Sequence, residues 1–116
     1  QTPEWRGPAV WVHADLLPGN LLIHRGRLSA VIDFGSVGLG DPASDLIVAW
    51  NLLPKGARVD FRAALQIDDA TWARGRGLAL AIALVALPYY QYTNPVFAEI
   101  ARHTIAEVLA DCRHGA

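Results

Sequence analysis

The chain has little of several residue types on which other classes of protein depend. Its single cysteine, Cys112, permits no internal disulfide, and no signal peptide is evident, so we expect a cytoplasmic protein. Ten Lys and Arg residues balance eleven Asp and Glu residues, and no basic run occurs. This charge pattern argues against a nucleic-acid partner.

The sequence also lacks an apolar run long enough to cross a membrane. The longest run, Leu78 to Leu87, has ten residues, whereas a span needs about 20. We therefore predict no membrane partner and a helix that is buried on nearly all sides. Hydrophobic residues make up 53% of the 116 residues, which is ample for the core of one domain. So high a content also predicts an apolar surface that contacts something other than water.

The most informative stretch runs from Val10 to Asp45. In it, His13 and Asp15 are followed by Asn20, five residues after Asp15, and then by the tripeptide Asp33-Phe34-Gly35. This ordered set, His-x-Asp-x-x-x-x-Asn and Asp-Phe-Gly, is typical of the catalytic half of protein kinases.

The residue types in this set fit phosphoryl transfer. The reaction mainly requires that reactants be positioned and negative charge be neutralised. Magnesium uses few protein ligands, because phosphate oxygens and water supply the rest. We assign Asn20 and Asp33 to Mg²⁺ and the nucleotide, ATP or GTP, and Asp15 to the catalytic base that orients the acceptor hydroxyl.

The spacing also predicts that these residues meet. The apolar runs Asn20 to His24 and Leu28 to Asp33 flank Arg25-Gly26-Arg27, which indicates a hairpin with glycine in its turn. Asn20 and Asp33 then lie at the open end of the hairpin. Each residue alone could be a simple turn former or strand end, but their joint order favours the functional interpretation.

Two further residues are predicted to support the loop. His13 has no second histidine at metal-ligand spacing, so we expect it to fix the loop backbone through a hydrogen bond. Asp41 and Pro42 begin a helix as N-cap and first helical residue. Asp45, one turn into that helix, is placed to bind the amides of the loop from behind.

The motifs resemble those of the aminoglycoside phosphotransferase and choline-kinase-like family, the small-molecule relatives of protein kinases. They are His-Ala-Asp-Leu-Leu-Pro-Gly-Asn, Val-Ile-Asp-Phe-Gly and Gly-Asp-Pro-Ala-Ser-Asp. The last motif follows Asp33-Phe34-Gly35 almost at once, whereas protein kinases have an activation segment after Asp-Phe-Gly. Family members often carry glycine where Ala14 stands, and many protein kinases carry arginine there.

The resemblance implies a mainly helical α+β fold: a protein-kinase-like C-terminal lobe with a small β-hairpin beside the catalytic loop and about four helices. It implies transfer of the γ-phosphoryl group of ATP or GTP, with Mg²⁺, to a hydroxyl of a small molecule, such as an aminoglycoside or another antibiotic. An antibiotic-resistance role would be inferred from the family only.

The family's N-terminal lobe supplies a glycine-rich loop and a lysine for the phosphates, but the only lysine here, Lys55, follows the motifs. We therefore expect residues 1–116 to be the catalytic-loop and acceptor-binding lobe, without the nucleotide-binding lobe and inactive alone. The surface that the nucleotide-binding lobe would otherwise cover could also support homo-oligomers.

Two other functions remain open. The chain could be a non-catalytic binding or assembly module on a kinase scaffold, or a metal-dependent phosphohydrolase with water as acceptor. The acceptor itself is equally open. A cationic amino sugar would need carboxylates, whereas an apolar antibiotic would prefer Trp50 and the tyrosines. The candidate carboxylates, which the sequence does not rank, are Asp60, Asp68, Asp69, Glu99 and Glu107.

Helical periodicity predicts the remaining elements. Helices are expected over residues 42–53 and 58–65, from an N-cap at Asp68 through residue 87, and from Pro95 onwards. Pro54 is expected to end the first of these, and Pro88 to kink or end the third. Residues 35–40 are predicted to be a glycine-rich connector.

Overall fold

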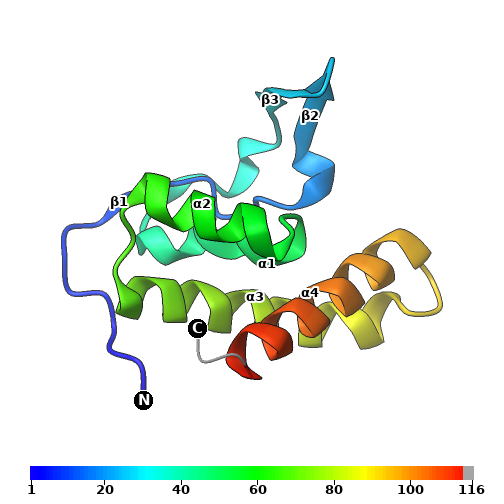
Figure 1. Cartoon of the computed structure of the whole chain (residues 1–116). Coiled ribbons are helices and arrows are strands. Elements are labelled where there is room, and N and C mark those ends of the chain that lie inside the picture. Colours follow the sequence, from blue (N-terminus) through cyan, green and yellow to red (C-terminus); the bar gives the residue numbers. More distant parts are fainter. Residues whose placement is uncertain (114–116) are drawn as a thin grey trace.

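The computed structural model describes residues 1–113 and places two small β-sheets beside a layer of helices (Figure 1). The fold is mainly helical, as predicted. In chain order the elements are β1 (Val10–Val12), the 3₁₀ helix η1 (Pro18–Asn20), β2 (Leu21–His24), β3 (Arg27–Val31), η2 (Phe34–Ser36), β4 (Gly38–Gly40), η3 (Pro42–Ile47), α1 (Val48–Asn51), α2 (Lys55–Leu65), α3 (Asp69–Tyr90) and α4 (Pro95–Arg113).

The predicted hairpin is confirmed. Strands β2 and β3 pair antiparallel, and they project away from the helices in Figure 1. Because His24 faces Arg27, the turn consists of Arg25 and Gly26 alone, with φ angles of 51° and 76°. Two consecutive positive φ angles are typical of a type I′ turn, whose twist matches that of the strands. The second arm therefore begins at Arg27, one residue earlier than predicted.

A second sheet forms where a connector was predicted. Strand β4 pairs antiparallel with β1, so that Val10 faces Gly40 and Val12 faces Gly38. The prediction of a plain connector over residues 35–40 was therefore incomplete, because glycine-rich sequence carries no strand signal of its own. The pairing fixes the start of the loop after β1 next to Gly38, and the start of β1 next to Gly40, which leads into η3.

The core lies between η3, α1, α3 and α4. Trp50 is completely buried, and its ring centroid lies 4.6 Å from that of Trp72 on α3. The predicted helix over residues 42–53 is instead the 3₁₀ helix η3 followed by α1, which ends at Asn51. Pro54 does not end this helix but caps the start of α2, three residues before its predicted beginning.

The prediction that residues 78–87 are buried on nearly all sides was wrong. Ala79 and Ala83 are buried, whereas Leu84 and Val85 are 54% and 74% exposed. The elements that contact α3 most are α4 and η3, and they do not cover Leu84 and Val85. By length and composition alone, α3 could cross a membrane, a property that core helices of soluble proteins share. Its first half packs in the core through Trp72.

Close packing explains one glycine of α3. A Cβ atom added to Gly75 would lie 2.8 Å from the Cβ of Leu46, so any side chain would push η3 away. Pro88 neither ends α3 nor stops its hydrogen bonding, because Gln91 N–H still donates to Leu87 C=O at 2.9 Å and the helix extends to Tyr90. So close to a helix end, the missing N–H of proline costs only one hydrogen bond.

Candidate active site

The imidazole of His13 holds the loop after β1 in place through two hydrogen bonds. The ring is buried, and its Nδ1 accepts a hydrogen bond from the Asp15 N–H at 3.1 Å. The ring proton therefore lies on Nε2, which donates to the Ile32 carbonyl at 2.8 Å. His13 thus joins the loop to the end of β3, and its ring also packs edge-on against Phe34.

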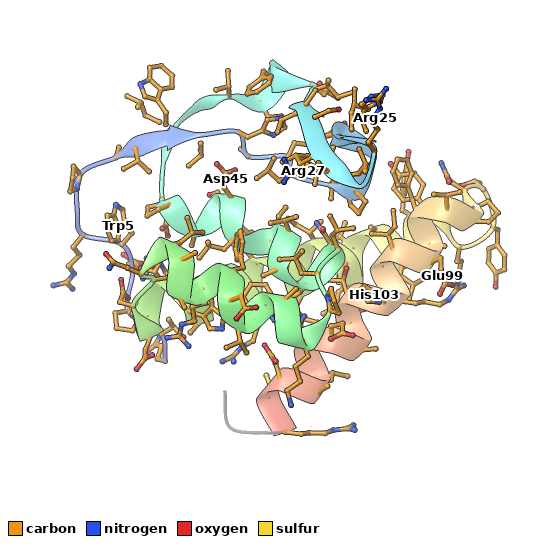
Figure 2. The ribbon with its side chains drawn as sticks, turned by 45° about the horizontal axis from the view of Figure 1, so that its top comes forward. Trp5, Arg25, Arg27, Asp45, Glu99 and His103 are labelled. Carbon is orange, nitrogen blue, oxygen red and sulfur yellow. The ribbon has the colours of Figure 1, made fainter. Side chains whose placement is uncertain are left out.

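The carboxylate of Asp45 holds the same loop from the helical side. Its Oδ2 accepts from the His13 N–H and its Oδ1 from the Ala14 N–H, both at 2.9 Å. In Figure 2, Asp45 rises from η3 towards β1 and the loop. Ala14 has a φ of 68°, a left-handed conformation that L-residues other than glycine rarely adopt. The two hydrogen bonds hold the loop in this unusual turn.

Asp15 and Asn20 are in direct contact. The Asn20 Nδ2 donates to the backbone carbonyl of Asp15 at 2.8 Å and lies 3.3 Å from its Oδ2. Both amide hydrogens therefore point towards Asp15. The Oδ1 of Asn20 accepts no hydrogen bond from residues 1–113, so a cation could bind it.

Asp33 lies at the same end of the hairpin. The N–H of the preceding residue, Ile32, donates to the Asn20 carbonyl at 2.9 Å. Asp33 itself has a φ of 61° and is exposed, and its carboxylate makes no hydrogen bond or ion pair within the described residues. The hairpin therefore brings the segments of Asn20 and Asp33 together, as the sequence predicted.

An amide oxygen and a carboxylate are hard ligands that suit Mg²⁺. Within residues 1–113, no group of three His, Cys, Asp or Glu side chains could hold a metal ion. Two protein ligands suffice for a magnesium ion whose other positions are filled by water and phosphate oxygens, and Asn20 and Asp33 have the chemistry for such a pair.

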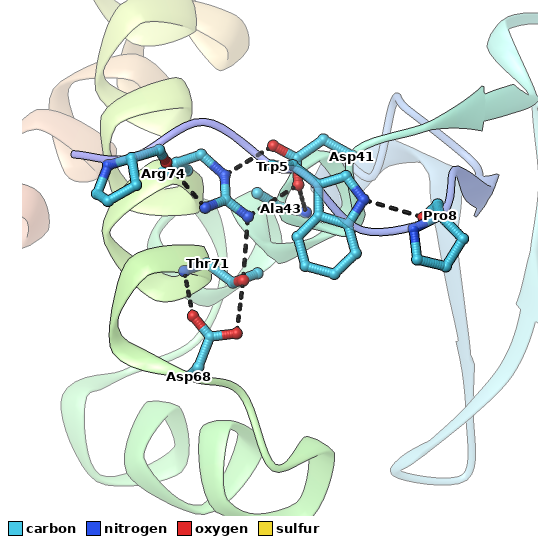
Figure 3. A network of polar contacts seen from close by, with 8 residues as sticks. Trp5, Pro8, Asp41, Ala43, Asp68, Thr71 and Arg74 are labelled. Atoms are coloured by element: carbon cyan, nitrogen blue, oxygen red, sulfur yellow. Dashed lines mark hydrogen bonds and ion pairs between the residues drawn. The ribbon is translucent and has the colours of Figure 1, made fainter.

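A contact that the sequence did not reveal fixes the start of η3 (Figure 3). Asp41 caps this helix by accepting from the Ala43 N–H, and it also accepts from Nε of Arg74 at 2.8 Å. Partial burial alone would raise the pKa of Asp41, but the bonds from Arg74 and Ala43 outweigh it and hold the pKa below its ordinary value.

The same guanidinium anchors the N-terminal segment. Arg74 donates to the Pro3 carbonyl at 3.1 Å and lies 5.6 Å from the ring centroid of Trp5, whose indole N–H donates to Pro8 (Figure 3). Arg74 on α3 therefore connects the lead-in to β1 with the helix that carries Asp45.

Most candidate acceptor-binding carboxylates have other partners. Asp68 caps α3 by accepting from the Thr71 N–H at 2.8 Å, and this bond lowers the pKa of Asp68. Glu107 pairs with the buried Arg58 at 2.6 Å, and Asp69 pairs with Arg62. Glu99 lies 3.5 Å from Arg102 on the same helix. These carboxylates thus have partners within the helical part of the chain.

Trp50 does not line a binding pocket. Its side chain is completely buried, and its indole N–H donates to the carboxylate of Asp111 at 2.8 Å. Tyr90 packs against Phe97, whereas Tyr89 and Tyr92 are 73% and 89% exposed.

Comparison with known proteins identifies one family. The family model described as the phosphotransferase enzyme family matches residues 1–78. The match covers the loop, the hairpin, η3 and the first half of α3, and so every residue assigned above to catalysis, metal binding or loop support. None of the curated proteins and none of the solved structures matches the chain.

Proposed function

The chain belongs to the phosphotransferase enzyme family, and we propose that it is the C-terminal lobe of a small-molecule kinase with a protein-kinase-like fold. The enzyme transfers the γ-phosphoryl group of ATP or GTP to a hydroxyl of its acceptor. The observation that carries this proposal is the contact between Asn20 and Asp15 at the open end of the hairpin, where Asp33 also lies.

In this proposal, Asp15 is the base. Its backbone N–H is bound to His13 and its carbonyl to Asn20, so the carboxylate starts from a fixed position. It accepts the proton of the acceptor hydroxyl as the oxygen attacks phosphorus, and it orients that oxygen for attack in line with the leaving group.

Asn20 and Asp33 would hold Mg²⁺, which neutralises charge on the phosphates when bound. Asn20 has its amide hydrogens on Asp15 and its oxygen free, so one side chain links the base to the metal site. Asp33 is exposed at the left-handed turn that begins η2. His13 and Asp45 act only by supporting the loop.

We further propose that a nucleotide-binding lobe completes the enzyme. The cross-strand neighbours Trp11 and Leu39 of the β1–β4 sheet are 74% and 62% exposed, so an apolar surface is available for such a lobe. Phe34, beside Asp33, is 53% exposed. A cytoplasmic enzyme with a small-molecule acceptor is consistent with the composition.

The test uses the two-lobed protein, which is this chain together with the proposed nucleotide-binding lobe. It measures ADP formation with Mg-ATP and a panel of small-molecule alcohols. The proposal expects ADP and phosphorylated product only when an acceptor is present. ADP without any acceptor would indicate a phosphohydrolase, and no affinity for Mg-ATP would indicate a non-catalytic module. A matched Asp15→Asn protein should bind Mg-ATP normally and form no product above about 1% of the normal rate.

A further inference from the structure

The segment that carries Asp15 is held by one side chain from the helical layer that no motif singles out. Asn51, the last residue of α1, donates from Nδ2 to the backbone carbonyl of Leu16 at 3.0 Å, across 35 residues of sequence. Leu16 directly follows Asp15, so this bond fixes the Leu16–Leu17 peptide plane, one peptide beyond the proposed base. Asn51 is only 6% exposed.

The other bonds of this segment do not reach the helices. Leu17 N–H donates to the Asp15 carbonyl and Asn20 N–H to the Leu17 carbonyl, both within the loop. Asp45 binds only the amides of His13 and Ala14, at the loop's first turn. Within residues 1–113, the bond from Asn51 is therefore the one hydrogen bond that ties residues 15–19 to the helical layer.

Asn51 is itself rigidly placed. The carbonyl of Ala49, two residues earlier, accepts from the guanidinium of Arg58 at 2.8 Å, and Arg58 is in turn paired with Glu107 on α4. The end of α1 is thus fixed against α2 and α4. Through its side chain, Asn51 can therefore hold the loop at a fixed place relative to the helical layer.

Only the donor half of the Asn51 amide has a partner in the described part of the chain. Its Oδ1 is buried and finds no hydrogen-bond donor in the described part of the chain, and its side chain lines an apolar cavity of about 240 Å³ between α3 and α4. The donor Nδ2 is the half of the amide that is used.

We propose that Asn51 is a positioning residue, which sets the place of the Asp15 carboxylate through the Leu16 carbonyl. This inference rests on the proposed function for its effect on catalysis, but its effect on the loop can be measured without any activity. Misplacing a reacting group by about 1 Å can cost a hundredfold in rate, so loss of one such bond has a measurable effect.

The test compares Asn51→Leu with Thr104→Val. Thr104 is equally buried and lines the same cavity, but its hydroxyl donates to Ile100 within α4 and does not reach the loop. Hydrogen exchange by NMR on the 116-residue chain should show the amides of Leu17 and Asn20 exchanging about tenfold faster in Asn51→Leu and unchanged in Thr104→Val. Asn51→Ala serves if Asn51→Leu does not fold.

Turnover of the two-lobed protein supplies the second readout. In Asn51→Leu, kcat should fall at least about tenfold while KM for the nucleotide stays within about threefold, and Thr104→Val should be normal. Unchanged exchange in the loop, or equal acceleration throughout the chain, would overturn the inference, and so would a looser loop with normal kcat. If the wild-type protein shows no phosphotransferase activity, the proposed function fails, and exchange still decides whether Asn51 positions the loop.

Discussion

Asp45 and Ala14 form a pair in which the carboxylate Oδ1 accepts the backbone N–H at 2.9 Å while Ala14 is held at a φ of 68°. A left-handed conformation costs an L-residue roughly 1–2 kcal/mol, and glycine avoids that cost. This strain is a physical reason to expect glycine to be favourable at this position.

The strain predicts that Ala14→Gly stabilises the chain. Relief of the left-handed cost should exceed the entropy that glycine loses on folding, for a net gain of up to about 1 kcal/mol in the free energy of unfolding. Urea denaturation measures it. Ala106→Gly, an exposed position within α4, is the control and should lose about 1 kcal/mol. Equal losses in both variants would show that Ala14 is not strained.

Removal of the Asp45 carboxylate should loosen the loop. Asp45→Ala leaves the N–H of the buried His13 without its acceptor, so we expect a loss of about 2–3 kcal/mol in the free energy of unfolding. Asp45→Asn keeps one acceptor oxygen and should lose about half as much. Thermal and urea denaturation distinguish the two, and an Asp45→Ala chain as stable as the wild type would refute the loop-holding role.

The bond from Arg74 to Asp41 predicts a pH-dependent contribution to stability. The pKa of Asp41 in the folded chain lies below the ordinary value of 3.8, so its contribution is present above about pH 4 and is lost as the pH falls through the lowered folded-state pKa. Arg74→Met should therefore differ most from the wild type at pH 7, and the difference should shrink below pH 4. Urea denaturation at pH 7, 5, 4 and 3 measures it. A constant difference would mean that Asp41 is not the linked group.

The buried guanidinium of Arg58 should matter far more to stability than exposed ion pairs. Its side chain is 3% exposed and pairs with Glu107 at 2.6 Å and Asp111 at 3.7 Å. Because Arg58→Met leaves buried carboxylate charge without its partner, we expect a loss of about 3–5 kcal/mol in the free energy of unfolding. Arg102→Met removes the exposed pair with Glu99 and should change stability by less than about 1 kcal/mol.

Local signals of the sequence predicted the elements that local chemistry controls. The turn at Gly26 and the N-caps at Asp41 and Asp68 all depend on neighbours within a few residues, and all three are found. The segments of Asn20 and Asp33 meet because a hairpin joins its own ends.

Long-range contacts were out of reach of the same reasoning. Pairing of β1 with β4, the bond from Arg74 to Asp41 and the bond from Asn51 to Leu16 each join residues 26 or more positions apart, with no periodicity to reveal them. The exposure of Leu84 and Val85 was missed for a related reason, since a run of apolar residues does not say how many neighbours will cover it.

The central claim is that Asp15 is the base of a phosphotransferase. The most direct measurement is the rate of phosphoryl transfer by the two-lobed protein carrying Asp15→Ala, with nucleotide affinity measured on the same preparation. The account predicts that kcat falls by about 10²–10⁴ while the dissociation constant for Mg-ATP changes less than about threefold, because the acceptor alone loses its partner. An Asp15→Ala enzyme that retains near-normal turnover would contradict it.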